Sequence, residues 1–120
     1  MNNKKNLKSI FSGIEEYWTP KIIGEVNDSY VKVFKAKGEF VWHTHEHEDE
    51  FFLVVSGILH VKMHDREVVL RAGETFVVPK GVEHMPYADE EAHVLLFEPK
   101  EVINTGNVVS EKTHVELEKC

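Results

Sequence analysis

Four side chains in this sequence have the types and the spacing of a metal site. His43 and His45 lie two residues apart, so on an extended strand both imidazoles would project to the same side. Glu50 follows after a four-residue loop and opens an apolar run, which would place its carboxylate across from the two imidazoles. Two imidazoles and one carboxylate make most of the open-sided site that Fe, Mn, Ni, Cu or Zn uses. His84, just past a Pro-Lys-Gly turn, is the candidate for a fourth ligand.

The other histidines are weaker candidates, although the chain has eight histidines in 120 residues. His47 shares the parity of His43 and His45 and could extend the site, but the acidic residues around it are typical of a solvated loop. The role of His47 is therefore left open. The remaining four show no convergence on the site and are interpreted as surface or incidental residues: His60, His64, His93 and His114.

The segments that must position these side chains have the patterns of short strands. Each combines β-branched, aromatic or alternating apolar residues with a turn signal at its end. Many short strands with closely spaced turns favour an all-β sandwich or barrel of the jelly-roll kind. The expected strands are Ile22–Val26, Tyr30–Ala36, Phe40–His45, Phe51–Val55, Ile58–His64, Val68–Leu70, Phe76–Val78 and His93–Phe97.

A helix is expected ahead of these strands. Residues 7–18 have apolar side chains at spacings of three and four, which predicts one short amphipathic helix. Asn6 could cap this helix, and Pro20 would end it. Gly13 lies inside the pattern and weakens it.

The strand Phe51–Val55 differs from the others because it contains no polar residue. Such a run is typical of a strand that is covered on both faces. We expect one face to meet the barrel interior and the other to meet a neighbouring sheet or a second subunit. On this basis the protein is predicted to be a homodimer.

The sequence around the candidate ligands resembles the two motifs of the cupin superfamily. The first motif is KGEFVWHTH at residues 37–45, followed by Glu50 and Gly57. The second motif is GETFVVPKGVEH at residues 73–84. Eight positions match the family in order and spacing: His43, His45, Glu50, Gly57, Gly73, Pro79, Gly81 and His84.

Two positions depart from the family's pattern. One residue fewer than usual lies between Gly38 and His43, and Ala88 stands where the family often has Asn. Neither departure falls on a candidate ligand, so the interpretation as a metal site is unaffected by both.

The resemblance implies a fold, a cofactor and a set of ligands. The fold is all-β, a cupin-type jelly-roll β-barrel with a short N-terminal helix, and the cofactor is one divalent metal ion (Fe, Mn, Ni, Zn or Cu). The chain then divides into a helical lead at 1–21, the barrel at 22–98, and a C-terminal turn and tail at 99–120. The implied metal ligands are His43, His45, Glu50 and His84.

Composition and charge exclude other classes of function. A formal net charge of −7 makes nucleic acid and anionic membrane surfaces poor partners. The single cysteine, Cys120, excludes an intrachain disulfide and any multi-cysteine zinc site. The start of the chain has no signal-peptide pattern, and the longest apolar run is far shorter than the roughly 20 residues of a membrane span. We therefore expect a cytoplasmic protein.

The expected function follows from the metal and its surroundings. A divalent ion with three imidazoles and one carboxylate could polarise a carbonyl, or bind O₂ together with an oxygen-chelating substrate. We expect a metal-dependent enzyme, dioxygenase-like or isomerase-like, whose partner is a small oxygenated molecule. The alternative is a non-catalytic module that binds or senses a small molecule. No general acid or base stands out among the polar residues near the site: Tyr30, Lys32, Thr75, Glu83 and Tyr87.

Overall fold

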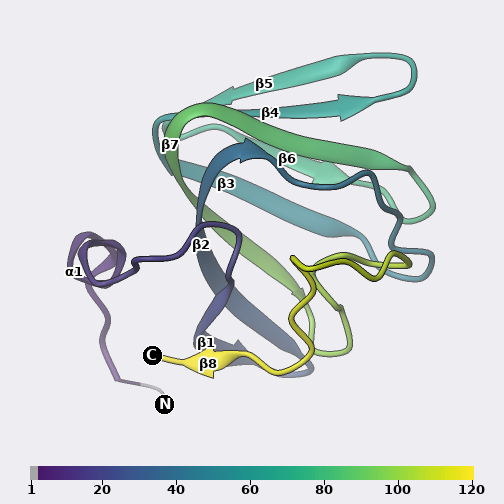
Figure 1. Ribbon diagram of the computed structural model, residues 1–120. Helices are drawn as coiled ribbons and strands as arrows, with labels where there is room; N and C mark the ends of the chain where they lie inside the picture. The colour runs from purple at the N-terminus through teal and green to yellow at the C-terminus, as the bar shows by residue number, and fades with distance from the viewer. Residues whose placement is uncertain (1–2) are drawn as a thin grey trace.

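The computed structural model describes residues 3–120 and shows one curved β-sheet with a short helix on its outside (Figure 1). The strands follow each other in the sheet in the order β5-β4-β7-β2-β1-β8, and β3 pairs with both β6 and β7. The bounds are α1 Leu7–Ser12, β1 Lys21–Val26, β2 Ser29–Glu39, β3 Glu50–Ser56, β4 Ile58–Met63, β5 Glu67–Arg71, β6 Thr75–Val78, β7 His84–Pro99 and β8 Glu118–Lys119.

The long strand β7 holds the fold together. Its 16 residues pair antiparallel with β4 at one end, with β2 along most of the length, and with β3 toward the other end. Inward-facing side chains from β2, β3, β4 and β7 meet in one apolar core, so the sheet curls around a shared interior. Leu59 and Val61 are fully buried there, as their alternation predicted. The all-β jelly-roll fold with a short N-terminal helix is thus confirmed.

The helix is shorter than the apolar spacing over 7–18 predicted. It ends at Ser12, because Gly13 follows as the C-cap and turns its backbone N–H back onto the helix. Asn6 is the N-cap, as expected, and its side chain accepts a hydrogen bond from a backbone N–H in the first turn. The apolar residues after Gly13 continue without a helix, and Trp18 inserts into the barrel core beside Phe34.

The expected strand Phe40–His45 is wrong. Regular pairing of β2 ends at Glu39, and the following segment makes one isolated bridge, between His43 and His84. Gly38, with φ of 76°, lies where the β2–β7 register shifts, and the chain leaves the sheet shortly after it. His43 and His45 are therefore presented by an irregular segment rather than by one face of a strand.

The strand β7 begins at His84, nine residues before the predicted His93. The nine added residues include Pro86 and the acidic stretch 89–91, which lack the apolar pattern of a strand. In the fold these acidic side chains are exposed, while Pro86 is buried in the stretch that pairs with β4.

The apolar strand β3 has one fully covered and one partly covered face. Phe52 and Val54 point inward and are buried. On the outer face, Val55 packs against the cluster around α1, so the helix provides part of the cover that was expected from a sheet or a subunit. Phe51 and Leu53 stay half-buried. Among residues 3–120, no helix has the length and apolar character of a membrane span.

Candidate metal centre

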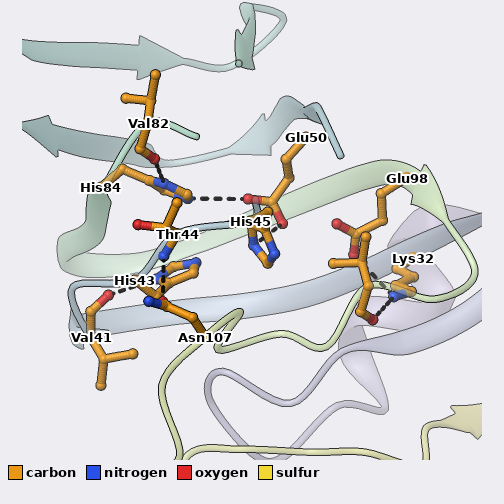
Figure 2. A network of polar contacts seen from close by, with 11 residues as sticks. Lys32, Val41, His43, Thr44, His45, Glu50, Val82, His84, Glu98 and Asn107 are labelled. Atoms are coloured by element: carbon orange, nitrogen blue, oxygen red, sulfur yellow. Dashed lines mark hydrogen bonds and ion pairs between the residues drawn. The ribbon is translucent and has the colours of Figure 1, made fainter. Parts of the chain in front are cut away.

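The four side chains singled out in the sequence meet at one point in the barrel (Figure 2). Each offers a ligand atom, and these atoms lie within 4.8 Å of one another. All four are buried, with exposed fractions of 2% for His43, 5% for His45, 4% for Glu50 and 0% for His84. The structure thus brings the predicted residues together, and their role as ligands stays a prediction.

Backbone pairing explains why these residues converge. His43 and His84 exchange two backbone hydrogen bonds, from His43 N to His84 O at 3.0 Å and from His84 N to His43 O at 2.9 Å. Their ring centroids are consequently 4.3 Å apart. Glu50 begins β3 opposite Val78 of β6, and this pairing turns its carboxylate inward. The backbone of His45 is held by Gly81, whose N–H donates to His45 O at 2.9 Å.

Two of the imidazoles are oriented by backbone carbonyls. His43 Nδ1 lies 2.8 Å from Val41 O, and His84 Nδ1 lies 2.9 Å from Val82 O. A carbonyl oxygen can only accept, so each Nδ1 carries the proton and donates it. In a neutral ring Nε2 then presents a lone pair, which is the form in which histidine binds a metal.

The carboxylate of Glu50 joins the other two histidines. Its oxygens lie 3.3 Å from His84 Nε2 and 3.4 Å from His45 Nε2. His45 Nε2 is buried and forms no hydrogen bond with a partner of good geometry. A buried nitrogen without a partner is costly, and a metal ion bound at this point would satisfy it. Three imidazole nitrogens and one carboxylate are a suitable donor set for a divalent transition metal.

The protonation states also suit a metal. Burial, reinforced by the neighbouring His84, lowers the pKa of His43 to about 4, so this ring is neutral near pH 7. Burial alone would raise the pKa of Glu50, but its close contacts with His45 and His84 outweigh burial and hold that pKa well below its usual range. For His45, burial lowers the pKa, and its contact with Glu50 raises it further than burial lowers it. A metal ion at this point would therefore compete with a proton for His45.

A second buried pair lies beside Glu50 and was missed in the sequence. Lys32 Nζ is 3.0 Å from Glu98 Oε1, and both residues are 1% exposed (Figure 2). Burial, followed by the charge of Glu50, raises the pKa of Glu98 well above its usual range. Its second oxygen, Oε2, has no hydrogen-bond partner. Glu98 shares the inward parity of Leu96 on β7, and this alternation was the available signal.

The other candidates lie outside the cluster. His47 is exposed and takes no part in it. His60 pairs with Glu67, and His64 with Glu83, on the outside of the barrel. Among the remaining polar residues considered, Lys32 is buried in the interior, whereas the others are half-buried or exposed: Tyr30, Thr75, Glu83 and Tyr87.

Two cavities of different character flank the cluster. One is narrow, with a volume of about 30 Å³, and reaches His43 and Glu50. The other is wider, with a volume of about 200 Å³, and reaches His45 beside three carboxylates, those of Glu46, Glu48 and Glu101. The remaining lining of the first cavity is almost entirely apolar: Trp18, Pro20, Phe34, Phe40, Phe52, Pro86, Leu96 and Asn104.

Comparisons with known proteins agree with this geometry. Residues 30–98 match the family model described as a cupin domain. YdbB, an uncharacterised protein of Bacillus subtilis strain 168, is 36% identical over 85 residues, which are 70% of this chain and 75% of the relative.

Two solved structures are also similar. A cupin-2 domain containing protein from Shewanella frigidimarina is 44% identical with a TM-score of 0.79, and the match covers 80% of this chain and 94% of that chain. A protein from Neisseria meningitidis is 33% identical with a TM-score of 0.74, and the match covers 82% of this chain and 100% of that chain.

Proposed function

The chain belongs to the cupin family, and from this premise we propose that it is a metal-dependent enzyme acting on a small oxygenated molecule. One divalent metal ion would be held by His43, His45, Glu50 and His84. The observation that supports this most directly is the convergence of these four buried side chains, with one imidazole nitrogen left without a partner. A divalent ion bound there would supply Lewis acidity and open positions for oxygen atoms.

The protein's own residues prepare the site for such an ion. The carbonyls of Val41 and Val82 fix the protons of His43 and His84 on Nδ1, which keeps both Nε2 atoms available. The low pKa of His43 means that a metal ion displaces no proton from this ring near pH 7. Because the pKa of His45 is raised, a metal ion that binds this ring competes with a proton for it, so metal affinity should rise with pH.

The apolar cavity favours one class of substrate. Its tryptophan is already engaged, because Trp18 Nε1 donates to Lys37 O at 2.9 Å. Both ends of the Asn104 amide are bonded to the tail, at Lys112 O and His114 N. Beyond His43 and Glu50, the lining side chains therefore offer little hydrogen-bonding capacity, namely the second donor and second lone pair of the Asn104 amide.

A sugar-like molecule would leave its hydroxyl groups unpaired in such a cavity, at a cost of about 1–3 kcal/mol for each. A substrate with an apolar body and two oxygen atoms at one end, such as an enol, a β-diketone or a catechol, avoids that cost where its body contacts the apolar lining. Of the dioxygenase-like and isomerase-like alternatives, the cavity therefore favours the dioxygenase-like reaction.

Metal analysis combined with a turnover assay tests this proposal. Natively purified wild-type protein should contain about one transition-metal ion per chain, and His45→Ala should lose it. His60→Ala is the matched control, because His60 lies outside the cluster. O₂ consumption is then measured with acetylacetone, catechol and glucose 6-phosphate. Turnover of the first two compounds, dependent on the metal, is the expected result.

Other outcomes assign the protein differently. Equal metal content in wild type and His45→Ala, or no metal in either, contradicts the proposed site. Ligand-induced thermal stabilisation without turnover identifies a non-catalytic binding module. Metal-dependent conversion of glucose 6-phosphate without O₂ consumption identifies an isomerase.

We also propose that the protein is a cytoplasmic homodimer. The outer face of β3 and its neighbours carries a row of paired apolar residues, in which Phe51 lies opposite both Val77 and Phe97. Val77 is 46% exposed and Phe97 is 39% exposed. A second copy packing on this row would bury all three side chains. Sedimentation analysis should show a dimer for wild type and a monomer for Phe97→Glu, and a monomeric wild type contradicts the proposal.

A further inference from the structure

The C-terminal tail, residues 100–120, contacts the segment that carries two of the four clustered side chains. After β7 the chain turns back and crosses beside the loop between β2 and β3 (Figure 1). The family match ends at residue 98, so the tail lies beyond it. Its contact with the site involves Gly106 and Asn107.

The segment from His43 to His45 has a sheet neighbour on one side only. On that side His43 exchanges backbone hydrogen bonds with His84. The N–H and C=O groups of Thr44 point the opposite way, where an ordinary strand would have a second neighbour. Without partners for these two groups, no hydrogen bond on this side would hold the two peptide groups that lie between the histidines.

Asn107 supplies both missing partners. Thr44 N donates to Asn107 Oδ1 at 2.9 Å, and Asn107 N donates to Thr44 O at 3.1 Å (Figure 2). One residue of the tail thus provides the acceptor and the donor that a neighbouring strand would have provided. The pair of bonds fixes the plane of the peptide groups on either side of Thr44, and with it the directions of the His43 and His45 side chains.

Gly106 allows the tail to come this close. Its φ is 57°, a conformation that glycine adopts without steric cost. A Cβ at this position would lie 2.3 Å from Thr44 O and 3.2 Å from His43 Cδ2. The tail therefore touches the imidazole of His43 as well as the neighbouring backbone, and any larger residue would push the two segments apart.

The turn that carries Asn107 is itself held in place. Thr105 is fully buried, and its hydroxyl donates to Val108 O at 2.6 Å. The amide of Asn104 bonds to Lys112 O and His114 N, which ties the turn to the rest of the tail. Val102 is buried beneath it. Asn107 is thus presented by a packed turn.

From these contacts we propose that Asn107 is a positioning residue for the metal centre. It acts through Thr44 and holds His43 and His45 in the arrangement that binds the ion, with Gly106 providing the close approach. This inference rests on the proposed ligand set. It goes beyond that set because it makes the tail part of the metal centre.

Cobalt binding by the full-length chain tests the proposal. Co²⁺ is titrated into metal-free wild type, Asn107→Ala, Asn107→Asp and Gly106→Ala, and both the affinity and the visible spectrum are recorded. Asn107→Ala should bind Co²⁺ about 10- to 100-fold more weakly, the usual effect of losing a residue that orients a ligand, with an altered spectrum. Asn107→Asp retains the acceptor oxygen and should keep the wild-type spectrum. Val109→Ala is the control, because Val109 is 91% exposed on the same tail.

The spectrum distinguishes positioning from a general loss of stability. A residue that only stabilised the fold would lower the melting temperature of the metal-free protein and leave the Co²⁺ spectrum of the folded fraction unchanged. Wild-type affinity and spectrum in Asn107→Ala overturn this inference alone. If Asn107→Ala does not fold, Gly106→Ala is judged by the same two readouts. A wild-type protein that binds no Co²⁺ overturns both this inference and the proposed function.

Discussion

The two halves of the candidate metal centre are positioned in different ways. Glu50 and His84 are the first residues of β3 and β7, so ladder hydrogen bonds to neighbouring strands fix their backbones. His43 and His45 lie outside any strand and depend on separate contacts, with His84, Gly81 and Asn107. The strands of the fold therefore support Glu50 and His84 directly. His43 and His45 are held in part by the tail, which lies more than 60 residues away in sequence.

From this comparison we expect mutations in the two halves to have different effects. Changes near the strand-held half should affect the stability of the whole barrel, because β3 and β7 carry its core. Changes near the irregular half should affect metal binding more than stability, because the tail packs on the mouth of the barrel and contributes little to that core.

The largest effect is expected at the buried pair beside the strand-held half. Lys32→Met leaves Glu98 buried without its partner, which should lower the free energy of unfolding by about 3–5 kcal/mol. The double variant with Glu98→Leu removes both buried polar groups and should recover most of that loss. Urea unfolding of the two variants and the wild type measures the difference. A single variant as stable as the wild type would show that the contact between Lys32 and Glu98 does not stabilise the fold.

Substitution of one glycine beside each half compares the two halves directly. Gly57, with φ of 82°, packs against β7, where a Cβ would lie 2.7 Å from Glu91 O and 2.9 Å from Ala92 Cα. Gly57→Ala should therefore lower the free energy of unfolding by about 3 kcal/mol, since β7 cannot move away. Gly106→Ala should cost about 1 kcal/mol, because the tail can shift, while weakening metal binding.

Thermal and urea unfolding of both metal-free variants, beside Co²⁺ titration, checks this prediction. The comparison between the halves fails if Gly106→Ala destabilises the protein as much as Gly57→Ala does. It also fails if the two variants lose Co²⁺ affinity equally while both remain folded.

A further effect, partly cancelled by His45, is expected from acid through His43. The unfolded chain protonates this ring below about pH 6.5, but the folded chain does so only below about pH 4. Between these values the unfolded state holds more protons, so the free energy of unfolding of the metal-free protein falls as the pH drops. His43 alone would contribute at most about 3 kcal/mol over this range. The raised pKa of His45 acts in the opposite direction and reduces the net change.

The measurement is urea unfolding of metal-free wild type and His43→Gln at several pH values between 7 and about 4.5. His43→Gln should lose less stability on acidification than the wild type. Identical slopes for the two proteins would show that His43 is not held in its neutral form by the fold.

Much of the fold and the cluster could be predicted from the sequence, because both follow from local patterns. Alternation placed Leu59 and Val61 inside, and the spacing of histidines and Glu50 indicated one common site. The reason given for His43 and His45 was nevertheless wrong, since they do not share a strand. A spacing of two residues is the same whether both side chains point to one side of a strand or an irregular segment holds them together. The sequence therefore could not distinguish these two arrangements.

The parts that could not be predicted depend on contacts between distant segments. Nothing in the local sequence of Asn107 connects it to Thr44. Glu98 resembled a charged residue at the end of a strand, and only its inward parity indicated that it would be buried beside Lys32. The helix ended early for a local reason, because Gly13 stopped it before the apolar spacing did.

The long strand β7 has a consequence for the order in which the protein is assembled. Its partners β2, β3 and β4 all precede it in the chain, so during synthesis they must wait until residue 99 has left the ribosome. Contacts between distant residues form slowly, because the loops between them must close first. The His43–His45 segment waits longer still, until residue 107 arrives. For the proposed ligand set, metal loading is therefore expected to be a late event that follows assembly of the sheet rather than guiding it.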